Sequence, residues 1–330
     1  MVQMLRCLTV GLLFGAARCP AAAVDFDGDG KTDPAVYYPA SGTWVARLSK
    51  SGAQTSCVLG GPDFLPAPGD YDGDRKADLV AYSASRALWL ARLSGGQSGQ
   101  LAFGRPGDWP VPADYDGDGR TDPAVYNPRT GVWTAQSLSG GWTQSVAWGY
   151  LGDFRPWERP QTYTVLPMPF DYNQDGRDDP GYYYRGTAMT NSGWHILYSG
   201  SGAVRHYTWG SSGSLPAPGN YQMAVLDAPR GICVYKVTTA EWFTPYRHGF
   251  QAGLYGRTLP VPGGDYDGNG YEDHAYYDYT TGDWTVVFNN GGTEVEGRPI
   301  QHGRLGGAGA VPANLYSTLY ALARYSVKPW

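Results

Sequence analysis

Five short loops of this sequence hold carboxylates at a spacing that suits metal coordination. In the first loop, carboxylates occupy positions 1, 3, 5 and 9: Asp25, Asp27, Asp29 and Asp33. Alternate side chains of a tight loop point to a common centre. Glycine at position 6 allows the backbone to aim the next carbonyl, that of Lys31, at the same centre. Hard oxygen ligands in this number favour Ca²⁺ over Mg²⁺. The absence of Cys and His from the loops argues against Zn²⁺.

Three other interpretations of these loops fit less well. An EF-hand needs a bidentate Glu at position 12 and flanking helices, but position 12 is Val36 in the first loop and strand-forming residues follow it. A phosphate-binding loop would need glycine where Asp25 stands. Simple polar turns also favour Asp and Gly. However, a turn alone does not require three or four carboxylates to be held together against their repulsion.

The loops recur along the chain, which indicates a repeat architecture. They begin at residues 25, 70, 114, 171 and 265, and two copies without the acids stand at residues 220 and 314. Each unit of about 45 residues contains an apolar run, a turn, a Trp-bearing run, and a third run that mostly ends in an aromatic residue and glycine. A Pro-rich segment then leads into the next unit. Four short strands per unit of this length are typical of a β-propeller blade.

We therefore predict an all-β fold, a β-propeller over residues 24–330. Seven loop positions favour seven blades, the last of them short of outer strands because the chain ends at Trp330. Residues just after position 23 could complete that blade and close the ring, and a six-bladed ring with an added piece remains an alternative.

These loops and their spacing resemble the FG-GAP/VCBS repeat family, whose calcium-binding blades also form integrin α-subunit propellers. The resemblance covers residues 24–330. It implies that each loop joins two strands of a blade and binds Ca²⁺ through positions 1, 3, 5 and 9 and the position-7 carbonyl. The implied ligands after the first loop are Asp70, Asp72, Asp74, Lys76 and Asp78; Asp114, Asp116, Asp118, Arg120 and Asp122; Asp171, Asn173, Asp175, Arg177 and Asp179; and Asp265, Asp267, Asn269, Tyr271 and Asp273. Arg75 stands where the second loop should have glycine.

Composition narrows the choice of partners. The 330 residues carry a formal net charge of −5, which argues against a nucleic-acid partner recognised through its phosphates. The ligand positions of the five loops hold 18 of the 30 acidic residues, so the acidity reflects the metal sites. An aromatic content of 14% excludes global disorder. We expect about five Ca²⁺ ions, a monomer, and an extracellular protein or glycan as ligand.

The first 23 residues have the layout of a secretory signal peptide. A basic residue, Arg6, precedes a short apolar run, and small residues ending at Ala23 follow it. We expect cleavage after Ala23 or after Ala17, and a secreted or cell-surface protein with no membrane span. Beyond Cys7 and Cys19, the two remaining cysteines, Cys57 and Cys233, are too few for a disulfide framework, so we expect free thiols.

Two sets of aromatic residues could bind a ligand. One Trp recurs in each unit: Trp44, Trp89, Trp133, Trp194, Trp242 and Trp284. Such repetition favours core packing between blades over sugar stacking. The insertion Leu151–Pro167 lengthens one interval, occurs once, and carries Trp157 and Tyr163. Unrepeated loops on repeat scaffolds often bind ligands, so these two residues are candidates, although the insertion could also cover a blade as a flap.

We expect a secreted, non-catalytic, calcium-binding propeller that acts as a binding or adhesion scaffold. The alternative is a calcium-stabilised enzyme acting on polysaccharide, a lyase or a glycosidase. The sequence contains no recognisable nucleophile motif, and its five histidines show no metal-ligand spacing.

Overall fold

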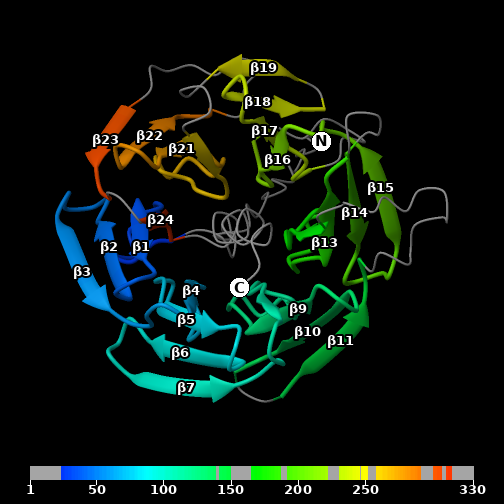
Figure 1. Ribbon diagram of the computed structural model, residues 1–330, viewed down its shortest axis with the longest axis horizontal. Coiled ribbons are helices and arrows are strands. Elements are labelled where there is room, and N and C mark those ends of the chain that lie inside the picture. The colour runs from blue at the N-terminus through cyan, green and yellow to red at the C-terminus, as the bar shows by residue number, and fades with distance from the viewer. Residues whose placement is uncertain are drawn as a thin grey trace, which may run out of the picture.

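The protein is a six-bladed β-propeller (Figure 1). The computed structural model describes residues 24–138, 141–149, 165–186, 192–221, 230–245, 247–251, 258–290, 300–306 and 310–313. These residues form six four-stranded antiparallel sheets and contain no α-helix. No helix among them is long and apolar enough to cross a bilayer. The all-β propeller predicted from the repeats is confirmed.

Each blade runs from an innermost strand outward. Blade 1 consists of β24 (Val311–Pro312), β1 (Ala35–Tyr38), β2 (Thr43–Arg47) and β3 (Gln54–Val58). Blade 2 consists of β4 (Phe64–Pro66), β5 (Leu79–Ser83), β6 (Leu88–Arg92) and β7 (Ser98–Ala102). Blade 3 consists of β8 (Trp109–Pro110), β9 (Ala124–Asn127), β10 (Val132–Gln136) and β11 (Thr143–Ala147).

The second half of the ring repeats this order. Blade 4 consists of β12 (Val165–Pro167), β13 (Gly181–Tyr184), β14 (Gly193–Leu197) and β15 (Val204–Thr208). Blade 5 consists of β16 (Ser214–Pro216), β17 (Val234–Lys236), β18 (Glu241–Thr244) and β19 (Arg247–Gln251). Blade 6 consists of β20 (Thr258–Val261), β21 (His274–Asp278), β22 (Asp283–Val287) and β23 (Ile300–Arg304).

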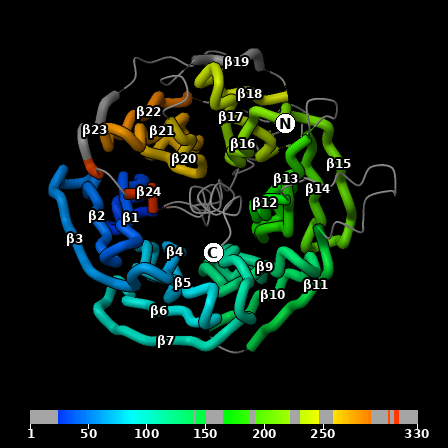
Figure 2. The backbone as a smooth tube through the Cα atoms, in the orientation of Figure 1, coloured from blue at the N-terminus to red at the C-terminus, as the bar shows by residue number. Residues whose placement is uncertain are grey.

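The ring closes by pairing the two ends of the chain, which corrects the preferred blade count. Strand β24 pairs antiparallel with β1, with Val36 opposite Pro312 and Tyr37 opposite Val311 (Figure 2). The seventh lead-in segment therefore supplies the innermost strand of blade 1, and residues after position 23 supply its three outer strands. Two partial units form one blade, so the described residues make six blades rather than the preferred seven.

A second detail of the chain differs from the sequence-based division. The last three residues of the predicted insertion, Val165–Pro167, form β12, the innermost strand of blade 4. They occupy the place of the Pro-rich lead-in of the other units. The candidate ligand residues Trp157 and Tyr163 lie outside the described residues.

A cross-strand Tyr–Trp pair forms the core of every blade. The six pairs have ring centroids 4.7 to 5.8 Å apart: Tyr37–Trp44, Tyr82–Trp89, Tyr126–Trp133, Tyr183–Trp194, Tyr235–Trp242 and Tyr277–Trp284. All six Trp side chains are at most 3% exposed. Their clusters extend to the following blade, as where Trp44 packs with Phe64 and Ala81. The repeated Trp residues are therefore core residues that hold neighbouring blades together, as their repetition predicted.

The glycine after the outermost strand of a blade makes room for this tyrosine. A β-carbon added at Gly104 would lie 2.9 Å from the Tyr82 hydroxyl, and one at Gly60 would lie 2.7 Å from the Tyr37 hydroxyl. Both glycines have positive φ, +102° and +97°. Any other residue would be strained at these φ values and would collide with the buried ring.

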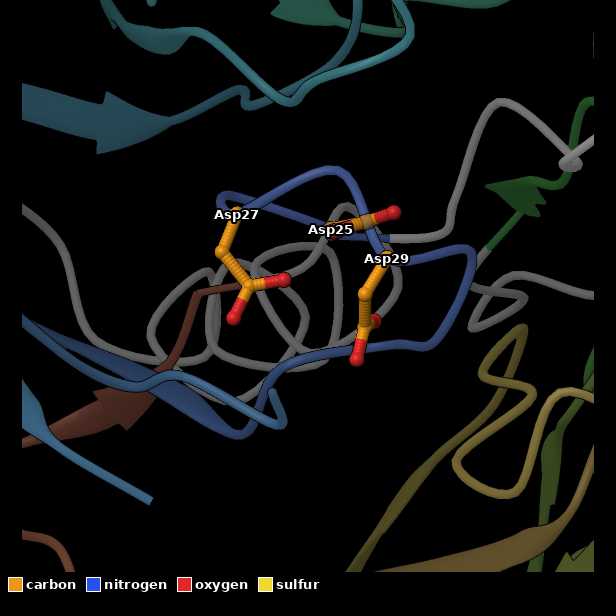
Figure 3. Close-up of side chains that lie close together, drawn as sticks. All are labelled: Asp25, Asp27 and Asp29. Carbon is orange, nitrogen blue, oxygen red and sulfur yellow. The ribbon is translucent and has the colours of Figure 1, made fainter. Parts of the chain in front are cut away.

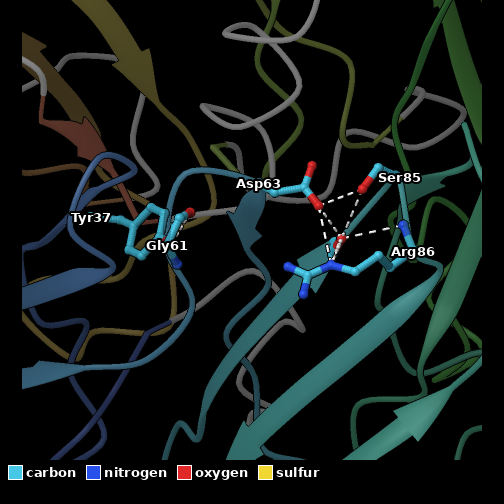
Figure 4. Close-up of polar contacts among 6 residues, drawn as sticks. Tyr37, Gly61, Asp63, Ser85 and Arg86 are labelled. Carbon is cyan, nitrogen blue, oxygen red and sulfur yellow. Dashed lines mark hydrogen bonds and ion pairs between the residues drawn. The ribbon is translucent and has the colours of Figure 1, made fainter.

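Polar contacts fix the end of blade 2 opposite its acidic loop. The Oδ2 atom of Asp63 accepts hydrogen bonds from the hydroxyls of Ser83 and Ser85, each at 2.5 Å (Figure 4). Arg86 pairs with the same oxygen at 3.3 Å and lies over the ring of Phe64. These contacts tie the start of β4 to the turn between β5 and β6, so both ends of the innermost strand are anchored.

We expect Gly104→Ala to destabilise the protein more than Gly96→Ala. Both glycines have positive φ, so alanine costs about 1–2 kcal/mol at either site. Only Gly104 faces Tyr82, whereas the space around Gly96 is open. The collision should add roughly 1–3 kcal/mol. Urea unfolding of the two variants measures the difference, and equal losses would contradict a packing role for the glycine after the outermost strand.

Candidate metal centres

The acidic loops connect the innermost strand of a blade to the next strand outward. The loop of blade 2, residues 70–78, lies between β4 and β5, and those of blades 3, 4 and 6 have the same place in their sheets. In blade 1 the loop precedes β1, while the innermost strand comes from the other end of the chain. The five loops therefore lie at equivalent places around the ring, as the repeat predicted.

Four of the five loops bring three carboxylates together. In each group, one oxygen per side chain lies within 4.8 Å of the others: Asp25, Asp27 and Asp29; Asp70, Asp72 and Asp78; Asp114, Asp116 and Asp122; and Asp265, Asp267 and Asp273. Figure 3 shows the first group, with the carboxylates of Asp27 and Asp29 directed to the same side of the loop. These groups have the composition and spacing of cation sites.

The loop of blade 4 differs from the other four at position 3. Among the described residues, Asp171, Asp175 and Asp179 do not form such a group. Asn173 stands at position 3, and its amide donates a 3.0 Å hydrogen bond to Asp175 Oδ2. A neutral amide thus stands where each of the four groups has a carboxylate, so this loop lacks one acid of the group.

The aspartate at position 1 organises each loop. In the first loop, Asp25 accepts hydrogen bonds from the amides of Gly28 at 2.7 Å and Gly30 at 2.8 Å. Asp70 accepts equivalent bonds from Gly73 and Arg75. These amides belong to positions 4 and 6, whose φ angles are positive in all five loops. Arg75, at φ +67°, therefore adopts the backbone of the glycine that it replaces.

The aspartate at position 9 ties the loop to its own blade. Asp33 accepts the amide of Phe26 at 2.8 Å and that of Ser49, just beyond β2, at 2.6 Å. Asp78 repeats this pattern with Tyr71 and Ser94. The carboxylate thus fixes both ends of the loop against the outer turn of the blade.

Burial raises the pKa values of these position-9 carboxyls. The pKa of Asp33 rises to about 6, because desolvation outweighs the hydrogen bonds from Ser49 and Phe26. The same cause raises the pKa of Asp78 to about 6 and of Asp122, Asp179 and Asp273 to about 7. Neighbouring carboxylates of the same loop raise these values further. The folded chain therefore keeps these acids partly protonated near neutral pH unless a cation lies beside them.

Several oxygens of the loops remain available to a cation. Asp27 Oδ1 is buried and accepts no hydrogen bond from the described residues. The carbonyls of position 7 accept no backbone hydrogen bond within the described part of the chain: Lys31, Lys76, Arg120, Arg177 and Tyr271. A buried, unpartnered carboxylate oxygen is costly and is satisfied well by a cation. The donor set consists of hard oxygens, so these residues fit Ca²⁺.

Hydrogen bonds join each loop to the loop of the preceding blade. The amide at position 8 donates to the carbonyl at position 1 of the preceding loop. Thus Ala77 donates to Asp25 and Thr121 to Asp70, both at 2.6 Å. Equivalent bonds run from Thr32 to Asp265, from Asp178 to Asp114 and from Glu272 to Asn220. We call these the junction bonds. They occur at five neighbouring pairs of blades, and the remaining pair involves residues that the structure does not describe.

Basic side chains at position 7 also reach the preceding loop. A β-carbon added at Gly28 would lie 2.9 Å from Lys76 Cε, and one at Gly73 would lie 2.8 Å from Arg120 Nε. Arg177 and Lys31 lie in the same way against Gly117 and Gly268. Each of these basic side chains thus lies against the acidic loop of the preceding blade. Tyr271, which is neutral, follows the loop at Asn220, which has no acid at positions 1, 3, 5 and 9.

Comparison with known proteins agrees with this geometry over part of the chain. Residues 70–125 match the model of the FG-GAP-like repeat. The match includes two acidic loops and the strands between them. It supports the family resemblance inferred from the spacing of the loops. A search of curated proteins found no match to the chain.

The solved structures that resemble this chain do so at very low identity. A streptogramin B lyase has 8% identity and a TM-score of 0.45, with 92% of this chain and 93% of that chain covered. A virginiamycin B lyase from Staphylococcus aureus has 9% identity and a TM-score of 0.43, with 89% and 95% covered. The dihydro-heme d1 dehydrogenase NirN has 11% identity and a TM-score of 0.34, with 84% and 55% covered. At this level of similarity, none of these structures informs the function of the acidic loops.

The sequence analysis did not identify the residues at position 8 of the acidic loops. Asp178 Oδ2 accepts the Asp114 amide at 2.8 Å, and the Glu272 carboxylate accepts the Asn220 amide. Burial raises the pKa of Asp178 to about 8 and that of Glu272 to about 7. Position 8 varies among Thr, Ala, Asp and Glu, so it gives no repeated side-chain signal. The part of the junction that recurs from blade to blade is the backbone amide, and an amide leaves no pattern in the sequence.

We expect the metal-free protein to lose stability as pH rises from about 4 to about 7. The position-9 aspartates have pKa values of about 6 to 7 when folded, against 3.8 ordinarily. The folded state therefore binds more protons in this window, and the free energy of unfolding falls as they are lost. Urea unfolding in EDTA across this range measures the slope, which Asp122→Asn should make shallower. A free energy of unfolding that rises with pH in EDTA would contradict the argument.

Proposed function

We propose that this chain is an exported, non-catalytic propeller whose loops bind Ca²⁺ and which serves as a binding scaffold for a protein or glycan. The observation that carries the proposal is the ring of carboxylate loops joined by the junction bonds. Export rests on the pattern of residues 1–23, which lie outside the described residues. The long interval before blade 4 supports a ligand role for Trp157 and Tyr163, which stays a prediction.

Calcium would act here on charge and on geometry. Three carboxylates within 4.8 Å repel one another in the folded state, and this repulsion opposes folding. In the first loop, Asp25, Asp27, Asp29, Asp33 and the Lys31 carbonyl would hold the ion. A bound divalent cation would remove the repulsion and fix the loop. The basic side chains at position 7 supply only part of this compensation.

The junction bonds would carry the effect of one ion to the neighbouring blade. The peptide group between positions 7 and 8 has its carbonyl available to the ion of its own loop. Its amide, such as that of Ala77, donates to the carbonyl of Asp25 in the preceding loop. The acceptor residue is itself an expected ligand of the next ion. Calcium would therefore stiffen the ring as a whole, and a ligand would meet a pre-organised surface.

We expect Asp116→Ala to have opposite effects with and without Ca²⁺. With Ca²⁺, loss of one site should cost about 1.4 kcal/mol, taking about 2 mM Ca²⁺ and a dissociation constant of about 0.2 mM. In EDTA, the same variant should be as stable as the wild type or more stable, because one repelling charge is gone. Thermal melting in each condition, together with metal analysis of the Ca²⁺-loaded protein, tests this. The metal content should fall by about one ion.

Glu241→Ala is the matched control, because Glu241 lies on β18 outside the acidic loops. It should leave the response to Ca²⁺ unchanged, and Mg²⁺ should replace Ca²⁺ poorly. The same samples should be screened on a glycan array. Binding without product that disappears in EDTA supports the scaffold, whereas product formation contradicts a non-catalytic role. A melting curve indifferent to EDTA would remove the calcium part of the proposal.

A further inference from the structure

Blade 4 breaks the repeat at one row of side chains across its sheet. Tyr182, His195 and His206 stand opposite one another on β13, β14 and β15. The equivalent rows of four other blades contain no histidine: Val36, Val45 and Ser56; Ala81, Leu90 and Gln100; Val125, Thr134 and Ser145; and Tyr276, Thr285 and Gln301. The row in blade 4 is therefore not required by the propeller core.

The two imidazoles of this row face each other through the same ring atom. His195 Nδ1 and His206 Nδ1 are 2.5 Å apart, and the rings meet edge to face with centroids 4.3 Å apart. A contact this short needs one nitrogen to carry a proton and the other to offer a lone pair. The pair thus shares a single proton between two nitrogens.

Aromatic side chains fix the inner imidazole of the pair. The His195 ring stacks on Tyr182 with centroids 4.8 Å apart and an interplanar angle of 8°, and it meets Tyr184 at 5.2 Å. His206 is exposed on the outer strand and lies 6.4 Å from the ring of Trp148, which comes from blade 3. One imidazole is therefore held rigidly while its partner can move, at a place open to solvent.

The inner imidazole of the pair is neutral, as metal binding needs. Desolvation and the neighbouring His206 lower the pKa of His195 to about 3, so its imidazole is neutral near pH 7. Neutral imidazole nitrogens are preferred ligands of divalent transition metals. They are poor ligands for Ca²⁺, which takes oxygen. The acidic loops therefore favour Ca²⁺, whereas this pair favours divalent transition metals.

We propose that His195 and His206 bind a divalent transition-metal ion of the Zn²⁺, Ni²⁺ and Cu²⁺ class through their Nδ1 atoms, with water completing the coordination. Zinc–nitrogen bonds of about 2.0–2.1 Å in tetrahedral geometry require the two nitrogens to be about 3.3 Å apart. A rotation of the exposed His206 side chain supplies this separation. The site would lie on the outer part of blade 4, where it does not depend on the loops that hold Ca²⁺.

The test is titration of the full chain, saturated with Ca²⁺, with each transition metal alone. Zn²⁺ binding by calorimetry and Cu²⁺ binding by electron paramagnetic resonance should both reveal one site. The copper spectrum should show coupling to two nitrogens. His206→Gln should lose this coupling and the Zn²⁺ site while keeping the melting temperature, because His206 is exposed. His302→Gln, on the outer strand β23 of blade 6, is the matched control and should bind as the wild type does.

A gain of binding tests the same geometry without loss of a core residue. Thr134 and Ser145 occupy the equivalent positions of blade 3, with their hydroxyls 3.2 Å apart. The double variant Thr134→His and Ser145→His should add a second copper site with two nitrogen ligands. Unchanged Zn²⁺ and Cu²⁺ binding in His206→Gln would overturn the proposal, as would a failure of the wild type to bind either metal. The outcome does not depend on the calcium proposal, which uses different residues.

Discussion

The junction bonds are the contacts on which the ring depends most directly. A propeller blade is held by its own strand pairing, but the order of blades around the axis needs contacts between sheets. The amide at position 8 supplies one such contact at each described junction, and its acceptor is the first residue of the neighbouring loop. The expected metal ligands and the contacts between blades therefore belong to the same short segments. Any change in the charge of one loop acts on the next blade as well.

This arrangement places like charges where the fold needs rigidity. Three carboxylates lie within 4.8 Å in four loops, and burial raises the pKa values of the position-9 carboxyls to about 6 or 7. The basic side chains at position 7 reduce this repulsion from the neighbouring blade. The hydrogen bonds of Asp25 and Asp33 hold the loop backbone in place even so. The loop backbone therefore has its geometry fixed without a bound cation.

The aromatic core is built in the same way in every blade. Each blade contributes one buried Tyr–Trp pair, and the glycine after the outermost strand leaves space for the tyrosine hydroxyl. Because this packing is the same around the ring, changes elsewhere in a blade are tolerated. Blade 5 has lost the acids of its loop yet keeps the junction bond from Glu272 to Asn220. Blade 4 carries the His195–His206 pair on a row that other blades fill with apolar or neutral polar residues.

The sequence alone determined the repeat unit, the four strands of each blade, the places of the acidic loops and the core role of the Trp residues. These features depend on local spacing, and each one recurs often enough to be recognised. Only the tertiary structure decided the number of blades, because β24 and β1 pair across almost the whole length of the chain. The junction bonds escaped prediction because they use backbone amides. The meeting of His195 and His206 required the register of two strands, which sets what lies opposite each residue and leaves no mark in the sequence.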